Sequence, residues 1–236
     1  MITREVIRKI ESLPESTIFG MKDFADLGNP QAVLLALSRL KKSGRIARLG
    51  KGKYYVPRKT KFGEVIPDEW RILDQVVKES GGYFAGNTAL NRIGVTTQVP
   101  SVVSIRGARS TRKLKIGSLT INLVRQGNKK AGIKDADLTD ILEALRLIRR
   151  TPDGATSKTI TRVRSIVEWR SEVDKKRLVS LAKNERPYVR ALLGAILQES
   201  DRRLSTELKE TLNPITRYRL SISSDILPNK TEWGID

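Results

Sequence analysis

Residues 36–58 read ALSRLKKSGRIARLGKGKYYVPR. The stretch begins as the end of a helix and breaks at Gly44, because glycine readily adopts the positive φ that follows many helices. It continues as two segments with β character, 45–49 and 53–56, on either side of a Gly-Lys-Gly turn. A helix followed by a β-hairpin decides the fold expected for the first sixty residues.

The helix before Gly44 is expected to begin at Asn29-Pro30, since asparagine is a favoured N-cap and proline a favoured first helical residue. Its apolar residues recur on one face and predict a buried stripe of Ala32, Val33, Ala36, Leu37 and Leu40. Upstream, the pattern predicts a helix over residues 3–13, a strand at 17–19 and a short helix at 21–27. Helix, strand, helix, helix and hairpin together predict a winged helix-turn-helix DNA-binding domain over residues 1–60.

The third helix of such a domain can enter the major groove of DNA, and the hairpin can reach the neighbouring backbone. Lysine and arginine neutralise phosphates, while glutamine and serine can contact base edges or phosphates. The candidate DNA-binding residues are Gln31, Ser38, Arg39, Lys42, Arg45, Arg48, Lys51 and Lys53. Residues 1–63 carry 14 Lys and Arg against 5 Asp and Glu, in a chain of net charge +19. Positive charge is therefore concentrated in the segment expected to contact DNA.

Leu34 and Leu35 lie on the same helix and are not the polar residues expected in a groove. They favour an alternative in which this segment is a protein-interaction module that docks an acidic partner without binding DNA. A stand-alone transcriptional regulator is a further alternative. RNA binding is disfavoured, because aromatic residues make up only 5% of the chain and do not cluster on the basic segment.

After a linker at residues 59–63, a second domain is expected over residues 64–236. Its first part, residues 64–126, combines a helix that follows Asp68, a short helix at 88–93 and β segments at 102–105, 112–116 and 119–124. Its second part, residues 135–236, is mainly helical, with helices expected from 136 to 150 and near 157–168, 173–183, 187–199 and 203–212. The expected fold class is α+β, mostly helical: a winged helix-turn-helix, a small α+β unit and a C-terminal helical region.

The chain contains neither Cys nor His. Disulfides, Cys/His zinc sites, cysteine nucleophiles and histidine-based catalytic triads are therefore excluded. No stretch approaches the ~18 apolar residues of a membrane span, and residues 1–5 lack the apolar core of a signal peptide. These observations predict a cytoplasmic protein.

One pattern matches a magnesium-dependent nuclease: Pro152-Asp153 followed by Glu207-Leu208-Lys209. The Glu-x-Lys of such a site belongs on a strand, whereas here it lies in a helical pattern. The glycine-rich segment 81–86 lacks the Lys-Ser/Thr of a phosphate-binding loop, and a turn is expected there. The aspartates Asp135, Asp137 and Asp140 are interpreted as charges at a helix N-terminus. We therefore expect no enzyme, no metal and no cofactor.

Several segments of the chain together carry a resemblance to a known family. In the first domain they are Asn29-Pro30-Gln31-Ala32-Val33, Ala36-Leu37-Ser38-Arg39-Leu40, Gly44-Arg45-Ile46 and the run from Arg48 to Tyr55. In the second domain they are Gly86-Asn87, Leu90, Gly94, Thr97-Gln98-Val99-Pro100 and Lys115-Ile116-Gly117. These segments resemble AbiEi-like antitoxins of type IV toxin–antitoxin systems. The combination with Thr-Gln-Val-Pro is the more specific part, and the match spans roughly residues 3–150.

The resemblance implies an antitoxin of a bacterial abortive infection system that neutralises a nucleotidyltransferase toxin. It also implies a transcriptional autorepressor whose winged helix binds inverted repeats in its own promoter, and a second domain that acts on the toxin. The partners expected on this basis are double-stranded promoter DNA and a cognate nucleotidyltransferase toxin, with no membrane.

Overall fold

The computed structural model describes residues 2–61, 63–108, 110–125, 131–150 and 155–236. The chain has an α+β fold and divides into two compact units, which are described separately. Unit 1 comprises residues 1–79 and 113–121, and unit 2 comprises residues 80–112 and 122–236. The predicted boundary at residues 60–64 lies inside unit 1.

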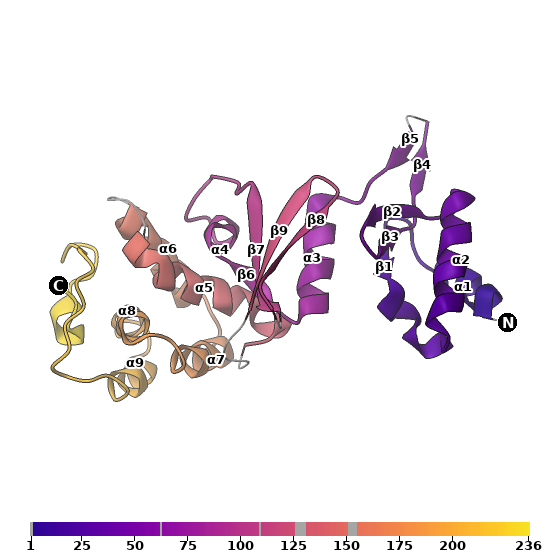
Figure 1. Cartoon of the computed structure of the whole chain (residues 1–236). Coiled ribbons are helices and arrows are strands. Elements are labelled where there is room, and N and C mark those ends of the chain that lie inside the picture. Colours follow the sequence, from indigo (N-terminus) through magenta and orange to yellow (C-terminus); the bar gives the residue numbers. More distant parts are fainter. Residues whose placement is uncertain (1, 62, 109, 126–130, 151–154) are drawn as a thin grey trace. The chain divides into compact units, whose positions relative to one another are not determined.

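The helices at the start of unit 1 enclose a small apolar core. They are α1 (Ile2–Glu11), the 3-10 segment η1 (Met21–Leu27) and α2 (Pro30–Lys42), drawn in indigo in Figure 1. The predicted helices are thus confirmed. The core consists of Val6, Ile10, Phe19, Phe24, Val33, Ala36, Leu37, Leu40 and Ile46. Phe19 and Phe24 meet edge to face with ring centroids 5.8 Å apart, an arrangement that aromatic quadrupoles favour.

Strands β1 (Ile18–Gly20), β2 (Ala47–Gly50) and β3 (Lys53–Tyr55) lie in the order β1-β3-β2, and both pairings are antiparallel. Gly20 faces Lys53 in this register, and a Cβ on Gly20 would lie 2.8 Å from the carbonyl oxygen of Gly52. The other edge of β2 pairs antiparallel with β8 (Arg112–Ile116), where Gly50 lies opposite Ile116. The hairpin tip is therefore joined to a strand some sixty residues later.

The sequence predicted a linker at residues 59–63, but this prediction is wrong, since two paired strands reach into this range. Strands β4 (Arg58–Thr60) and β5 (Gly63–Val65) pair antiparallel, and the hairpin stands away from the helices α1 and α2 (Figure 1). Residues 58–60 and 63–65 are mostly polar, charged or glycine, so they lack the apolar alternation that marks a half-buried strand. Helix α3 (Glu69–Ser80) follows, and it buries Ile72, Leu73, Val76 and Val77.

Strands β6 (Tyr83–Ala85) and β7 (Val102–Ala108) of unit 2 pair antiparallel. Strand β9 (Leu119–Arg125), which passes from unit 1 into unit 2 after Ile121, lies next to β7 in the order β9-β7-β6. Strand β6 was missed in the sequence, where a turn was expected. Gly82 allows the close approach of β6 to β7, because a Cβ there would overlap the carbonyl group of Arg106. Helix α4 (Asn87–Arg92) follows β6 and confirms the short helix expected at 88–93.

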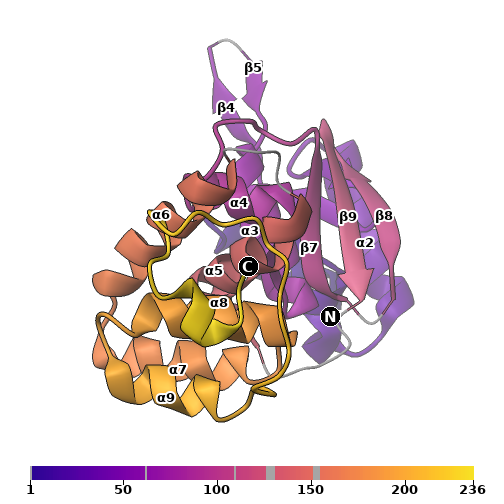
Figure 2. The same ribbon diagram turned by 90° about the vertical axis from the view of Figure 1, so that its left-hand side faces the viewer.

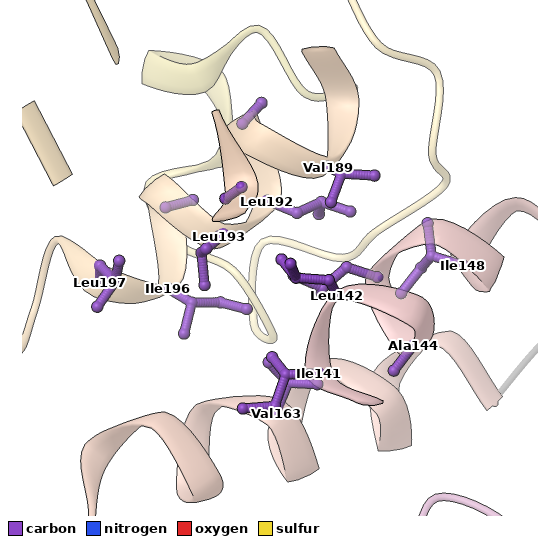
Figure 3. Packing of buried hydrophobic residues seen from close by; sticks show 14 of the residues in the cluster. Ile141, Leu142, Ala144, Ile148, Val163, Val189, Leu192, Leu193, Ile196 and Leu197 are labelled. Atoms are coloured by element: carbon purple, nitrogen blue, oxygen red, sulfur yellow. The ribbon is translucent and has the colours of Figure 1, made fainter. Parts of the chain in front are cut away.

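Helices form the rest of unit 2: α5 (Ala136–Leu147), α6 (Ala155–Glu168), α7 (Glu172–Ala182), α8 (Pro187–Leu197) and α9 (Arg202–Lys209), with the 3-10 segments η2 (Ile133–Asp135) and η3 (Ile148–Arg150) beside α5. Helix α5 is central, since it contacts α4, α6, α7 and α8 (Figure 2). Figure 3 shows its residues Ile141 and Leu142 packed with Val163 of α6 and Ile196 of α8. The helices expected from the sequence are all present, with ends shifted by a few residues.

Residues 138–145 of α5 are all buried, including the charged Asp140 and Glu143. The interpretation of Asp140 as a charge at a helix terminus is therefore wrong: its side chain is buried and accepts a bond from Nε of Arg92 at 2.9 Å. Asp137 is exposed in the first turn, as expected. Asp135 lies at the N-cap of α5, as expected, and its carboxylate also accepts two bonds from Arg177. This guanidinium keeps the pKa of Asp135 below its usual range.

The C-terminal segment closes over α8. Tyr218 forms a parallel bridge with Ile235, and the short η4 (Lys230–Trp233) packs against α8. The ring of Trp233 lies directly on Gly194, and its Nε1 donates a hydrogen bond to Oε1 of Gln198 at 2.5 Å. Within the described residues, every helix is too short or too polar to cross a membrane.

Candidate nucleic-acid interface

Helix α2 starts where the sequence placed it, and its cap is well formed. The side-chain oxygen of Asn29 accepts hydrogen bonds from the backbone N–H groups of Gln31 and Ala32 at 3.0 and 3.3 Å. Pro30 occupies the first turn, where its missing N–H is not needed. The buried face comprises Val33, Ala36, Leu37 and Leu40. This face fixes the rotation of the helix and so decides which residues reach the solvent.

The opposite face of α2 carries four of the candidate DNA-binding residues. Gln31, Ser38, Arg39 and Lys42 are all exposed. Their spacing places them along one stripe of the helix, because residues three or four apart are neighbours on its surface. The stripe ends in cations, which also favour the helix C-terminus. The face is open and positively charged.

The turn after α2 and the β2–β3 hairpin carry the remaining candidates. Ser43 bonds the carbonyl oxygen of Leu40 at 3.0 Å, and Gly44 has φ +69°. Arg45 forms an exposed ion pair with Glu11 at 3.1 Å, a kind of pair that contributes about 0–1 kcal/mol and can exchange for a phosphate. Arg48 is exposed and its Nε donates to the carbonyl oxygen of Gly50 at 3.2 Å. Lys51 is exposed at the tip of the turn.

Lys53 differs from the other candidates. Its ammonium is paired with the carboxylate of Glu79 on α3, and only 18% of its side chain is exposed. The charge of Lys53 is already neutralised inside unit 1. The same holds for Lys9 on α1, which bonds Asp26 at 2.9 Å and thereby lowers the pKa of that carboxyl. The open cations of this surface are therefore those of α2, Arg48 and Lys51.

Leu34 and Leu35 are 48% and 60% exposed. Both side chains therefore belong to the open surface of unit 1. By its spacing, Leu35 shares the stripe of Gln31, Ser38, Arg39 and Lys42. The candidate surface is thus basic with an apolar centre.

The structure adds Arg58 to the cations that the sequence analysis had proposed. It is exposed on strand β4, in the segment interpreted as a linker. The concentration of Arg58, Lys59 and Lys61 in four residues was the available signal. Because the β4–β5 hairpin had not been predicted, this cluster of cations could not be assigned to a surface.

The nuclease pattern is not assembled by the described residues. Glu207 lies in helix α9, where it pairs with Lys183 at 3.0 Å, and the ammonium of Lys209 lies 5.4 Å from the ring centroid of Trp233. Asp153 lies outside the described residues. In the part of the chain that the structure describes, no three Asp or Glu side chains are close enough to hold a metal ion.

Comparison with known proteins gives one family and one fold. The model of a family of unknown function (DUF6088) matches residues 5–179. No curated protein matches the chain. The crystal structure of the RV2827C protein from Mycobacterium tuberculosis is similar, with 13% identity and a TM-score of 0.53 over 99% of this chain and 89% of that one. At this identity the similarity concerns the fold alone.

Proposed function

The chain belongs to the DUF6088 family, and we propose that it is a DNA-binding antitoxin that represses its own operon. In this proposal α1, η1, α2 and the β2–β3 hairpin act as a winged helix-turn-helix. Helix α2 enters the major groove, and the hairpin contacts the neighbouring phosphates. The antitoxin role rests on the resemblance to AbiEi-like proteins described above.

The observation that carries the proposal is the open basic stripe of α2 beside the hairpin. A helix fits the major groove of B-DNA, which is about 12 Å wide, and the stripe presents Gln31, Ser38, Arg39 and Lys42 together. Arg48 and Lys51 lie on the hairpin that follows, and neither forms an ion pair within the described residues. Surface cations without carboxylate partners are those that gain most from replacing counterions on phosphates.

A footprinting experiment tests the repressor role. The full-length protein should protect a region upstream of its own gene at low salt. Replacing Arg48 and Lys51 together by alanine should remove the protection. The matched control replaces Arg4 and Arg8, two exposed cations on α1, and should leave it intact. Failure of the wild-type protein to protect any upstream region would refute the repressor role.

The antitoxin role requires a separate test, because it does not depend on DNA binding. If the adjacent gene encodes a nucleotidyltransferase, its expression should arrest growth, and co-expression of this chain should restore growth. The Arg48→Ala/Lys51→Ala variant should still restore it, since the second domain is expected to act on the toxin. Failure of the wild-type chain to restore growth would contradict the antitoxin role. The alternative of a stand-alone transcriptional regulator would then remain.

A second candidate function is favoured by the exposure of Leu34 and Leu35. Large apolar side chains in the middle of an open surface are typical of protein interfaces. In this alternative the stripe of α2 docks an acidic protein. Replacing Leu34 and Leu35 together by glutamine would then abolish rescue of toxin-arrested cells, and footprinting would show no protection at any salt concentration.

A further inference from the structure

Unit 2 contains a cavity that the proposed function does not use. It has a volume of about 310 Å³ and is lined from strands β6 and β7, helix α5 with η3, and the start of α8. Five of its lining residues are arginines: Arg106, Arg146, Arg149, Arg150 and Arg186. A single carboxylate, that of Glu143, faces them in the cavity wall. The site lies wholly within one compact unit.

The arginines reach the cavity from three separate parts of the chain. Arg146, Arg149 and Arg150 follow the helical spacing of three and four residues from α5 into η3. Arg106 comes from β7, and Arg186 immediately precedes the first turn of α8. Their convergence is a consequence of the fold and not of a local basic run. Such convergence from separate elements is typical of a binding site.

Hydrogen bonds and ion pairs hold the inner part of the cavity. The carboxylate of Glu143 is buried, accepts a hydrogen bond from the backbone N–H of Gly86 at 3.1 Å and pairs with both Arg106 and Arg146. Arg146 also bonds Glu185 with two nitrogens. Burial lowers the pKa of Arg146, but its bonds to Glu185 outweigh this effect and raise the pKa overall. The inner guanidiniums are therefore charged and fixed in place.

The positive charge in the cavity exceeds what the described residues neutralise. Nε of Arg106 is buried and has no hydrogen-bond partner among them. Arg149 is exposed and held over the ring of Tyr188 at 4.3 Å, and Arg150 and Arg186 are exposed with no carboxylate partner in the described part of the chain. An anion in the cavity would screen the repulsion between the guanidiniums.

We propose that this cavity binds a polyphosphate group, either free or as the tail of a nucleotide. The planar guanidinium donates two parallel hydrogen bonds to phosphate oxygens, and this preference distinguishes arginine from lysine. Several guanidiniums around one partly open cavity match a ligand with several negative charges. A cavity of about 310 Å³ is at the small end of ligand pockets and is too small for a nucleic-acid duplex.

Calorimetric titration of the full-length protein tests this site at ~0.15 M salt. The probes are sodium tripolyphosphate, ATP, GTP and sodium sulfate. Tripolyphosphate should bind to one site per chain, and sulfate should bind at least about tenfold more weakly. Equal affinity for ATP and tripolyphosphate assigns recognition to the phosphates alone, whereas ATP or GTP binding about tenfold tighter identifies a nucleotide as the source of the group.

Two double variants distinguish the cavity from general attraction to a basic protein. Arg150→Ala/Arg186→Ala removes two exposed arginines at the cavity without breaking an ion pair of the described residues, and should weaken tripolyphosphate at least about tenfold. Arg202→Ala/Arg203→Ala removes the same charge from the exposed side of α9, and should change affinity less than about twofold. The proposal is overturned if tripolyphosphate does not bind, if sulfate binds equally well, or if both variants lose affinity alike.

Discussion

The ammonium of Lys53 on strand β3 is paired with the carboxylate of Glu79 on helix α3. Glu79 also accepts a hydrogen bond from Nε2 of Gln75 at 3.0 Å, so the carboxylate is held in place. The pair joins the hairpin to the helix that follows it in unit 1. The pair also neutralises Lys53, one of the cations that the sequence analysis had proposed for contact with DNA.

Replacing Glu79 by glutamine should therefore strengthen DNA binding. The change releases the charge of Lys53, so that one more phosphate can be neutralised. The salt dependence of binding should become steeper by about 0.9 in the slope of log K against log salt. Fluorescence anisotropy with a labelled upstream duplex measures this slope. The control is Glu15→Gln, an exposed carboxylate that forms no ion pair with the residues that the structure describes, and an equal effect of both variants would assign the change to overall charge.

Leu35→Ala should reduce the affinity for the upstream duplex by about tenfold, with little change for random DNA. In a major groove an aliphatic side chain discriminates by touching thymine methyl groups, so its loss affects specific binding only. The side chain is 60% exposed, and the free energy of unfolding should change by less than about 0.5 kcal/mol. Equal weakening on specific and random DNA, measured side by side, would contradict a position in the groove.

Asp140 should make the stability of unit 2 depend on pH. Burial raises the pKa of Asp140 to about 7, although the guanidinium of Arg92 opposes the shift. Because the pKa is raised in the folded state, the stabilising contribution is complete below the unfolded pKa of about 3.9 and is lost as pH rises through 7. Relative to Asp140→Asn, the wild-type free energy of unfolding should fall with a slope of at most ~1.4 kcal/mol per pH unit over this range.

Urea unfolding at several pH values between 4 and 8 measures the difference. The matched control is Asp137→Asn, which removes a carboxylate that also faces Arg92 but is 65% exposed. This control should follow the wild-type pH dependence. If Asp140→Asn follows it as well, the carboxyl is ionised throughout the range.

Gly194→Ala should destabilise the protein by about 1–3 kcal/mol. Glycine to alanine within a helix normally stabilises by up to about 1 kcal/mol, so the expected sign is reversed here. The cause is the ring of Trp233, which occupies the space that a Cβ on Gly194 would need. In a Trp233→Ala background the same substitution should become neutral or stabilising. A destabilisation of the same size in both backgrounds would exclude the ring as the cause.

Local signals in the sequence predicted much of unit 1 correctly. Asn29-Pro30 and Gly44 set the ends of α2 through interactions within a few residues, and the apolar spacing fixed its buried face. Strands β4 and β5 were missed because their residues lack apolar alternation, and β6 was missed because glycines on both sides of it favour a turn. The spacing of apolar residues could not reveal that residues 138–145 of α5 are all buried. Asp140 and Glu143 are charged residue types that usually lie at the surface.

The candidate interface was predicted in part for the same reason. The exposure of Gln31, Ser38, Arg39 and Lys42 follows from helical spacing, which is a local property. The pairing of Lys53 with Glu79 joins residues 26 positions apart and depends on the packing of α3. The arginine cavity of unit 2 brings Arg106, Arg146 and Arg186 together over an even longer separation. Neither the Lys53–Glu79 pair nor the arginine cavity can be recognised from the sequence around its residues.

The most direct test of the account is the salt dependence of binding to the upstream duplex. We expect the full-length protein to bind with a steep negative slope of log K against log salt. The variant Arg39→Ala/Lys42→Ala/Arg48→Ala/Lys51→Ala should reduce the magnitude of that slope by about 3 to 4, since each lost phosphate contact accounts for ~0.9. A slope that the four substitutions leave unchanged would show that DNA does not lie on α2 and the β2–β3 hairpin.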